Sequence, residues 1–245
     1  MQRYIKKQLI EWKNRKDRKP LILKGARQVG KTYIIKEFGK EQYENTVYFN
    51  FDHDETLKQL FQSTKDPKRI LEQLTFVAGK AINPEKTLII FDEIQECPDA
   101  LNSLKYFQEE ANEYHIICAG SLLGIKLSHT SFPVGKVEYL QMQPMTFTEF
   151  LLADGSENLV KYMESIEKIE KIPDIIFTQL NEKIKSYFII GGMPEVVKTW
   201  VETKDIENVN RIQKQILNGY EDDFGKHTHT ANMQAKISII WESII

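Results

Sequence analysis

The segment Gly25-Ala-Arg-Gln-Val-Gly-Lys-Thr32 places the strongest constraint on how this chain can fold. It matches the pattern Gly-x-x-x-x-Gly-Lys-Thr, in which glycines let the backbone turn tightly around an anion. A short apolar run at 21–24 precedes it, and apolar residues at helical spacing follow it over 33–38. Strand, glycine-rich loop and helix in this order predict a phosphate-binding loop, because loop amides and the helix N-terminus then point at the phosphates.

The residues of this loop are expected to bind a nucleoside triphosphate. Lys31 is expected to reach the β- and γ-phosphates, and Thr32 to offer its hydroxyl to Mg²⁺. We therefore predict ATP and Mg²⁺ as the ligands. The predicted nucleotide-binding residues are Gly25, Ala26, Arg27, Gln28, Val29, Gly30, Lys31, Thr32 and Tyr33.

A second motif comprises four apolar residues at 88–91 followed by Asp92 and Glu93. At the carboxyl end of a buried strand, Asp92 is expected to hold Mg²⁺ together with Thr32. The next carboxylate, that of Glu93, is placed to polarise an attacking water, so the site is expected to hydrolyse the nucleotide. The segment that reads guanine in GTPases, Asn-Lys-x-Asp, is absent, and Asp92-Glu-Ile-Gln95 stands where their switch motif Asp-x-x-Gly would be.

Two further polar residues follow predicted strands and complete the predicted catalytic set with Lys31 and Glu93. Ser121 comes after the strand at 115–119, where a small hydroxyl could contact the γ-phosphate or the water. The same residue could instead cap a helix. Asn50 ends the strand at 46–51 and could restrain Glu93.

Apolar strands alternate with amphipathic helices up to about residue 145, which predicts an α/β fold with a parallel sheet. The predicted strands span 21–24, 46–51, 87–91, 115–119 and 137–140, and the predicted helices span 2–18, 33–38, 67–81 and 98–112. Thr146 and Glu149 form a capping-box pattern, and beyond them we expect helices and loops only. A separate helical subdomain is therefore predicted after residue 145.

The composition excludes several classes of protein. The 245 residues carry a formal net charge of −2, which argues against a wholly basic nucleic-acid binder. Cys97 and Cys118 lack metal-ligand or disulfide spacing, so we expect a reduced, cytoplasmic compartment. The first residues lack the apolar core that is typical of a signal peptide, and no apolar run is long enough to predict a membrane span. His227 and His229 lack a third ligand nearby, so no metal site is predicted there.

The motifs occur in an order that resembles a known family, the prokaryotic AAA+-type ATPases that carry a C-terminal domain of unknown function. The resemblance covers about residues 3–225. The motifs that carry it are Gly25-Ala-Arg-Gln-Val-Gly-Lys-Thr32, Phe91-Asp-Glu-Ile-Gln95, Ala119-Gly-Ser-Leu-Leu123, Phe132-Pro-Val-Gly135, Pro144-Met-Thr-Phe147 with Glu149-Phe-Leu151, and Gly191-Gly-Met-Pro-Glu195.

The resemblance implies a P-loop sheet of the additional-strand type, with strand order 5-1-4-3-2, a C-terminal helical lid and ATPase activity. It implies an ATPase core over 1–145, a helical lid over 146–225 and the start of a winged-helix-like segment over 226–245. Similar sequences have Gly-Arg where this chain has Gly135-Lys136. Because lysine lacks the planar fork of an arginine finger, we expect Lys136 to be a surface residue.

Two functional classes remain open on the sequence. In the first, the chain is a remodelling or motor ATPase that acts on nucleic acid or protein as a homo-oligomer. In the second, it is a slow nucleotide-dependent switch that controls a C-terminal effector. The near-neutral charge argues weakly against a motor that acts on nucleic acid, and the lack of a clear arginine finger favours activation in trans or slow turnover. No membrane partner is expected in either case.

Overall fold

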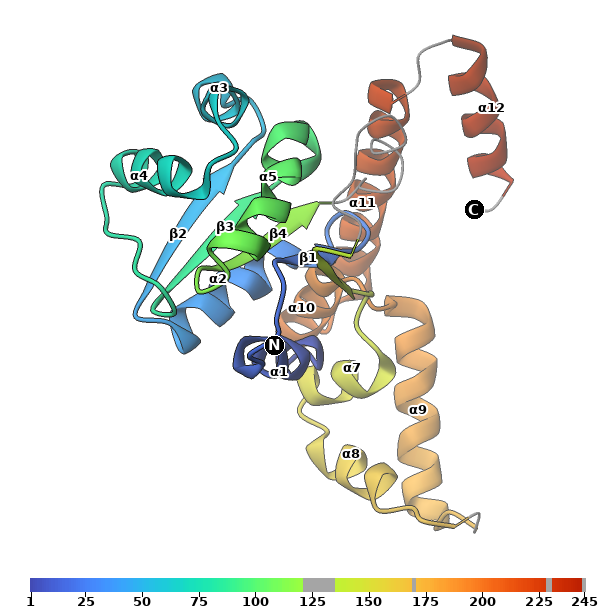
Figure 1. Cartoon of the computed structure of the whole chain (residues 1–245). Helices are drawn as coiled ribbons and strands as arrows, with labels where there is room; N and C mark the ends of the chain where they lie inside the picture. The colour runs from blue at the N-terminus through green and yellow to red at the C-terminus, as the bar shows by residue number, and fades with distance from the viewer. Residues whose placement is uncertain (121–134, 169–170, 228–230, 244–245) are drawn as a thin grey trace. The chain divides into compact units, whose positions relative to one another are not determined.

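The computed structural model describes residues 1–120, 135–168, 171–227 and 231–243, and the chain divides into two compact units (Figure 1). One unit comprises Arg3–Pro144. The other comprises Met145–Ile245 together with Met1–Gln2. The first unit is an α/β domain, and the described elements of the second are all helices.

The first unit is built on a five-stranded, fully parallel sheet. Its strands are β1 (Leu21–Lys24), β2 (Asn45–Asn50), β3 (Thr87–Asp92), β4 (His115–Gly120) and β5 (Glu138–Gln141). They lie in the order β2-β3-β4-β1-β5, which is the predicted order 5-1-4-3-2 read from the other edge. All residues of β3 and β4 are buried, as expected of parallel strands covered on both faces.

The strand register brings the polar residues of the two motifs to one edge of the sheet. Asp92 at the end of β3 lies beside Asn50 at the end of β2. Lys24, directly before the glycine-rich loop, lies beside Gly120 at the end of β4. Ligands of open parallel sheets bind beyond the carboxyl ends of the strands, and this edge is such a place.

Helices cover both faces of the sheet. On one face, α3 (Glu55–Ser63), α4 (Pro67–Ala78) and α5 (Pro98–Glu110) pack in a core with alternate strand residues such as Ile89 and Phe91. On the other face, α2 (Lys31–Gln42) lies close to Leu88, and α1 (Ile5–Asn14) packs against α2. A Cβ on Gly39 would lie 2.6 Å from Thr46 Oγ1, so the absence of a side chain there lets α2 approach the sheet.

The local signals for α4 and the strands are confirmed, whereas the first helix is shorter than predicted. Asp66 caps α4 by accepting a hydrogen bond from the Lys68 amide, and Pro67 is its first residue. The helix predicted over 2–18 ends at Asn14, because Arg15 turns into an extended conformation and its side chain pairs with Glu138 on β5. The Lys19 amide also donates to Glu138, at 2.9 Å, which leads the chain into β1.

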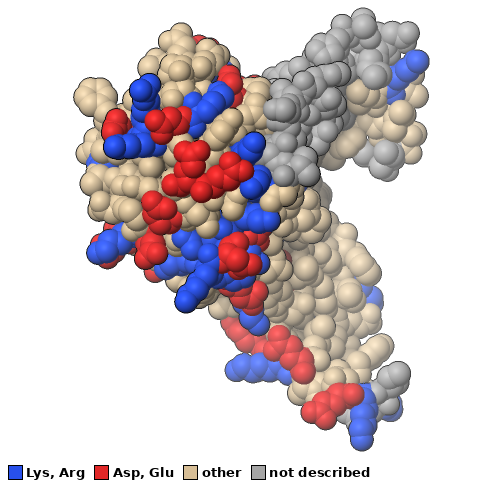
Figure 2. Space-filling view, viewed as in Figure 1, with Lys and Arg blue, Asp and Glu red and all other residues tan. Residues whose placement is uncertain are grey.

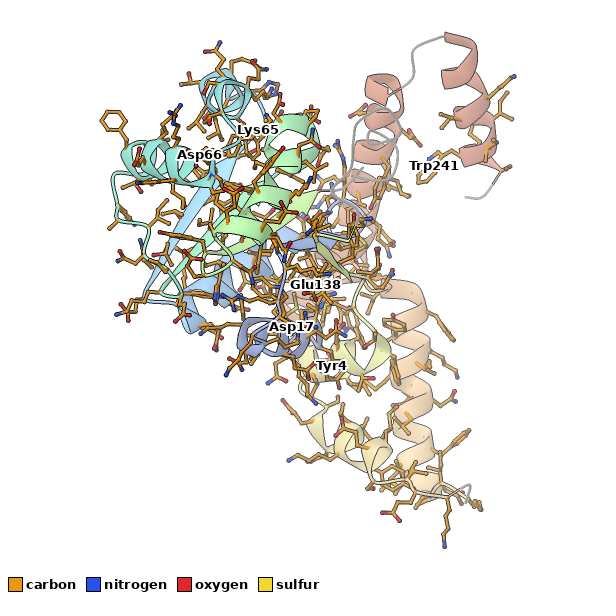
Figure 3. All side chains as sticks on the ribbon, in the orientation of Figure 1. Tyr4, Asp17, Lys65, Asp66, Glu138 and Trp241 are labelled. Carbon is orange, nitrogen blue, oxygen red and sulfur yellow. The ribbon has the colours of Figure 1, made fainter. Side chains whose placement is uncertain are left out.

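Two short elements were not predicted. The helix α3 is capped by Asp54, whose side chain accepts from the Leu57 amide, and the 3₁₀ helix η1 (Ile94–Glu96) follows Glu93. Lys65 and Asp66, labelled in Figure 3, lie in the connection between α3 and α4. There the Lys65 ammonium donates to the Phe61 carbonyl at 2.6 Å.

The second unit begins with the predicted capping box: the Thr146 hydroxyl accepts from the Glu149 amide, and the Glu149 carboxylate accepts from the Thr146 amide. Met145 and Phe150 lie in the core of this unit. Gly191 and Gly192 form the predicted turn between two helices. The helices are α7 (Phe147–Ala153), α8 (Glu157–Glu164), α9 (Asp174–Ile190), α10 (Pro194–Thr203), α11 (Ile206–His227) and α12 (Ala231–Glu242).

Across the described residues, no helix combines the length and the apolar character needed to cross a membrane. Cys97 and Cys118 are both buried and carry free thiols. Burial raises the pKa of each thiol above its ordinary value, as expected of cysteines that serve as packing residues.

Candidate nucleotide site

The glycine-rich loop leaves β1 at a point where only glycine fits. A Cβ on Gly25 would lie 2.3 Å from the carbonyl oxygen of Met142, a backbone atom that cannot give way easily. Gly30 caps α2 with a φ of 92°, in the left-handed region that glycine adopts at little cost. The loop therefore starts and ends at glycines for two different reasons, one steric and one conformational.

Lys31 lies inside the loop that it follows. Its ammonium donates to the carbonyl oxygens of Gly25 at 2.9 Å and of Ala26 at 2.8 Å, and the residue is 8% exposed. Burial lowers the pKa of Lys31, and the nearby carboxylates of Glu93 and Asp92 oppose that shift. The geometry therefore presents a largely buried cation at the place where the sequence predicts phosphate.

The hydroxyl of Thr32 meets the carboxylate of Asp92 across the edge of the sheet. Thr32 Oγ1 donates to Asp92 Oδ2 at 2.8 Å, although 59 residues separate the two in the chain. The same carboxylate oxygen accepts a 2.8 Å hydrogen bond from the Tyr48 hydroxyl on β2. Burial, and then this hydrogen bond, raise the pKa of Tyr48, so the phenol stays a donor. Asp92 is 4% exposed.

This pair of oxygens suits Mg²⁺. The ion prefers oxygen ligands and usually keeps several waters, so one or two protein groups and the phosphates of a substrate complete its shell. Among the residues that the structure describes, no group of three or more His, Cys, Asp or Glu gathers as a metal site. The donor set of Thr32 and Asp92 fits a magnesium ion shared with a nucleotide rather than an all-protein cage.

Glu93 follows Asp92 in a left-handed conformation, with φ 50° and ψ 43°, which is uncommon outside glycine and asparagine. Its amide donates to Asp92 Oδ1 at 3.0 Å. Its carboxylate oxygen Oε2 accepts a hydrogen bond from the side-chain amide of Gln95. The turn thus aims the two consecutive carboxylates differently, one at Thr32 and the other at Gln95.

The remaining predicted residues have varied surroundings. The Asn50 side-chain oxygen accepts from the Asp52 amide at 2.8 Å, which stabilises the turn after β2. Tyr33 is 63% exposed, and its hydroxyl lies 3.3 Å from Glu37 Oε1 on the same helix. Ser121 lies outside the described residues. Lys136 pairs with Glu109 on α5 at 2.8 Å, as a partly exposed surface residue.

Three residues of the site were missed by the sequence analysis: Arg3, Tyr48 and Gln95. The Arg3 guanidinium donates to the carbonyl oxygens of Val29 at 3.1 Å and of Gln143 at 2.6 Å. It thereby ties the glycine-rich loop to the segment that follows β5. The only available signal was for Gln95, which stands two residues after Glu93 in the motif Phe91-Asp-Glu-Ile-Gln95.

Comparison with known families agrees with this geometry. Residues 17–151, more than half of the chain, match the AAA domain family. The chain therefore belongs to that family, and its N-terminal part is a AAA-type ATPase domain. Residues 181–245 match a second family, described as a domain of unknown function (DUF8612). No curated protein sequence matches the chain.

Several solved structures are similar to this chain at low sequence identity. The Walker-type ATPase of Pyrococcus abyssi has a TM-score of 0.55 and 16% identity, over 93% of this chain and 76% of that one. AMPPCP-bound DnaA from Aquifex aeolicus has a TM-score of 0.45 and 12% identity, over 95% and 73%. Drosophila ORC bound to DNA has a TM-score of 0.47 and 18% identity, over 86% and 66%. At this low identity, the similarity to the Pyrococcus abyssi ATPase indicates a shared fold and nothing about function.

Proposed function

We propose that this chain binds ATP with Mg²⁺ and hydrolyses it. The observation that carries the proposal is the 2.8 Å hydrogen bond between Thr32 and Asp92, beside the ammonium of Lys31. The backbone amides of residues 25–30 and the side-chain ammonium of Lys31 bind the phosphates. Thr32 and Asp92 hold the metal, which when bound supplies positive charge to the phosphates. Tyr33 lies at the start of α2, next to this set.

Glu93 is the proposed general base. An attacking water gives a proton to the Glu93 carboxylate while its oxygen bonds to the γ-phosphorus. The bond from that phosphorus to the bridging oxygen breaks, and ADP and phosphate leave. Lys31 stabilises the charge that develops on the transferred group. Ser121 remains a proposed contact of the γ-phosphate or of the water, and Asn50 a proposed polar neighbour at the same sheet edge.

The helical unit is the proposed lid. Residues 146–225 would move with the nucleotide state and exclude water from the site. Residues 226–245 are proposed to start a winged-helix-like segment. These assignments, like a cytoplasmic location, remain predictions.

We propose that the chain forms a homo-oligomer that uses ATP hydrolysis to remodel a nucleic acid or a protein. The second candidate is a slow switch, and the charge distribution favours it. On the face shown in Figure 2, acidic and basic residues are interspersed over the N-terminal unit. Two basic residues near the N-terminus pair with acids: Lys6 on α1 with Glu41 at 2.6 Å, and Arg15, directly after α1, with Glu138. Interspersed and paired charges of this kind favour a nucleic-acid partner less than a continuous basic surface would.

The test is turnover of ATP and GTP by the purified chain, with and without Mg²⁺ and DNA. Lys31→Ala is expected to abolish nucleotide binding, while Lys40→Ala, an exposed lysine on the same helix, leaves it unchanged. Glu93→Gln is expected to bind ATP without cleaving it, while Glu110→Gln cleaves it normally. Normal binding by Lys31→Ala, or normal turnover by Glu93→Gln, would refute the proposed roles.

The same Glu93→Gln variant separates the two candidate roles. Oligomerisation in the presence of ATP, measured by light scattering, supports the remodelling ATPase, and stimulation of the wild type by DNA would identify the substrate class. A monomer that changes its protease sensitivity with ATP supports the switch.

A further inference from the structure

The carboxylate of Glu93 has a specific partner in the side chain of Gln95. Gln95 Nε2 donates to Glu93 Oε2 from two residues further along the chain. The link is local, because Glu93 adopts the left-handed conformation and η1 begins directly after it. The Glu96 amide closes this turn on the Glu93 carbonyl oxygen at 2.9 Å.

The backbone that carries Gln95 is firmly held. Ile94, its neighbour, is fully buried, and η1 packs against both β4 and α5. Gln95 itself is 5% exposed. Because the buried Gln95 side chain has little rotational freedom, its hydrogen bond restricts the orientation of the carboxylate of Glu93, the proposed general base.

Gln95 is a poor choice for packing alone. Its Oε1 atom is buried and has no hydrogen-bond partner among the residues that the structure describes. A buried acceptor without a partner destabilises a fold, and an apolar side chain of the same size would avoid that cost. The amide at this position is therefore explained by its N–H donor and not by burial.

We propose that Gln95 is a positioning residue for catalysis, which holds the Glu93 carboxylate in the orientation that accepts the proton of the attacking water. This inference rests on the proposed ATPase function. With Oε2 bound by Gln95, we assign proton transfer to Oε1 of the same carboxylate.

The experiment compares Gln95→Met with Gln108→Met in the full chain. Methionine keeps the length of glutamine and removes the donor. Gln108 on α5 is a matched control, because its Oε1 is also buried without a partner among the described residues. For each variant, kcat and KM for Mg²⁺-ATP, binding of a fluorescent ATP analogue and Tm are measured.

We expect Gln95→Met to lower kcat by about 10- to 100-fold, a part of what a general base contributes. KM and analogue binding stay within about twofold, and Tm is equal to or higher than that of the wild type. Gln108→Met keeps the wild-type kcat. Should Gln95→Met not fold, Gln95→Leu is a second apolar replacement that removes the donor, and the same fall in kcat is expected.

An unchanged kcat in Gln95→Met overturns the inference. A parallel loss of Tm, analogue binding and kcat also overturns it, because that pattern belongs to a structural residue. If the wild type binds ATP but does not cleave it, the proposed hydrolysis fails first, and this inference falls with it. Wild-type turnover with normal Gln95→Met turnover refutes the role of Gln95 alone.

Discussion

The hydroxyl of Tyr48 donates a 2.8 Å hydrogen bond to the carboxylate oxygen of Asp92 that also accepts one from Thr32. A residue of β2 thus orients the carboxylate at the end of β3. The Lys36 ammonium, 3.5 Å from the centroid of the Tyr48 ring, holds the ring from α2. Groups that hydrogen-bond to a metal ligand and orient it typically change metal affinity by about 10- to 100-fold when they are removed.

Removing this hydroxyl tests the relationship. Tyr48→Phe is expected to raise the Mg²⁺ concentration for half-maximal nucleotide binding by about 10-fold, because Asp92 loses a hydrogen bond that fixes its carboxylate. Titration of a fluorescent ATP analogue with Mg²⁺ measures the effect. Tyr106→Phe, on α5, serves as control, and an identical Mg²⁺ dependence in both variants would contradict the prediction.

His115 makes the stability of the N-terminal unit depend on pH. Burial, with smaller contributions from Arg18 and Lys13, lowers the pKa of His115 from 6.5 to about 4. The Tyr43 hydroxyl lies 2.7 Å from its Nδ1. Because the folded-state pKa is below the unfolded one, the stabilisation is complete above pH 6.5 and is lost as the pH falls towards 4. The loss amounts to roughly 3 kcal/mol.

Urea denaturation between pH 7 and pH 4 checks this slope. His115→Gln, which stays neutral throughout, is expected to flatten it. His53→Gln, at a residue whose side chain is 93% exposed, is expected to keep the wild-type slope. Equal slopes for the two variants would show that another group titrates.

Asp154 joins three helices of the second unit. It follows α7 and pairs with Lys183 on α9 and with Lys204 directly after α10, while its own side chain is 1% exposed. Desolvation alone would raise the pKa of Asp154, but the hydrogen bonds from the two lysines outweigh it and lower the pKa. This stabilisation is present above the unfolded-state pKa of about 3.8 and is lost as the pH falls through the lower folded-state value.

Asp154→Asn is expected to destabilise the second unit by about 1–2 kcal/mol, a figure reduced for the partial exposure of both lysines. Asp174→Asn breaks the ion pair between Asp174 and Lys171, whose side chains are 87% and 85% exposed, respectively. The free energy of unfolding should hardly change in this variant. Denaturant midpoints of the two variants provide the comparison. A loss of similar size in both would assign the effect to charge in general.

The turn at Gly192 depends on the absence of a side chain. A Cβ there would lie 2.2 Å from the Met145 carbonyl oxygen, and the Met145 amide donates to the Gly192 carbonyl at 2.6 Å. Gly192→Ala should therefore destabilise the second unit by about 1–3 kcal/mol through overpacking. Gly79→Ala, at an open left-handed position after α4, is expected to lose only about 1 kcal/mol. Chemical denaturation followed by circular dichroism would distinguish the two, and an equal loss would refute the steric argument.

The strands could be predicted because their signals are local and strong. Five apolar runs alternate with segments of helical periodicity, and this alternation predicts a parallel sheet. The loop motif at 25–32 also predicts a strand before it and a helix after it. The predicted ends fell within one residue of the observed strands. The first helix was predicted too long because the contact that ends it joins Arg15 to Glu138, a residue far along the chain.

Site residues were predictable where the chemistry lies in a contiguous motif and not where it depends on register. Lys31, Thr32, Asp92 and Glu93 belong to such motifs. Tyr48 reaches Asp92 only because β2 and β3 pair with Asn50 beside Asp92. Arg3 reaches Val29 from an N-terminal segment whose basic residues are otherwise typical of a solvated helix face.

The ammonium of Lys31 rests on the carbonyl oxygens of Gly25 and Ala26, inside its own loop. The lysine thus acts as an internal hydrogen-bond donor that keeps the loop assembled before any anion arrives. Capture of a phosphate is then an exchange of oxygen partners around one cation, and little chain has to be ordered at that moment. The loop loses its conformational entropy during folding. A nucleotide that binds later therefore meets a site that is already ordered.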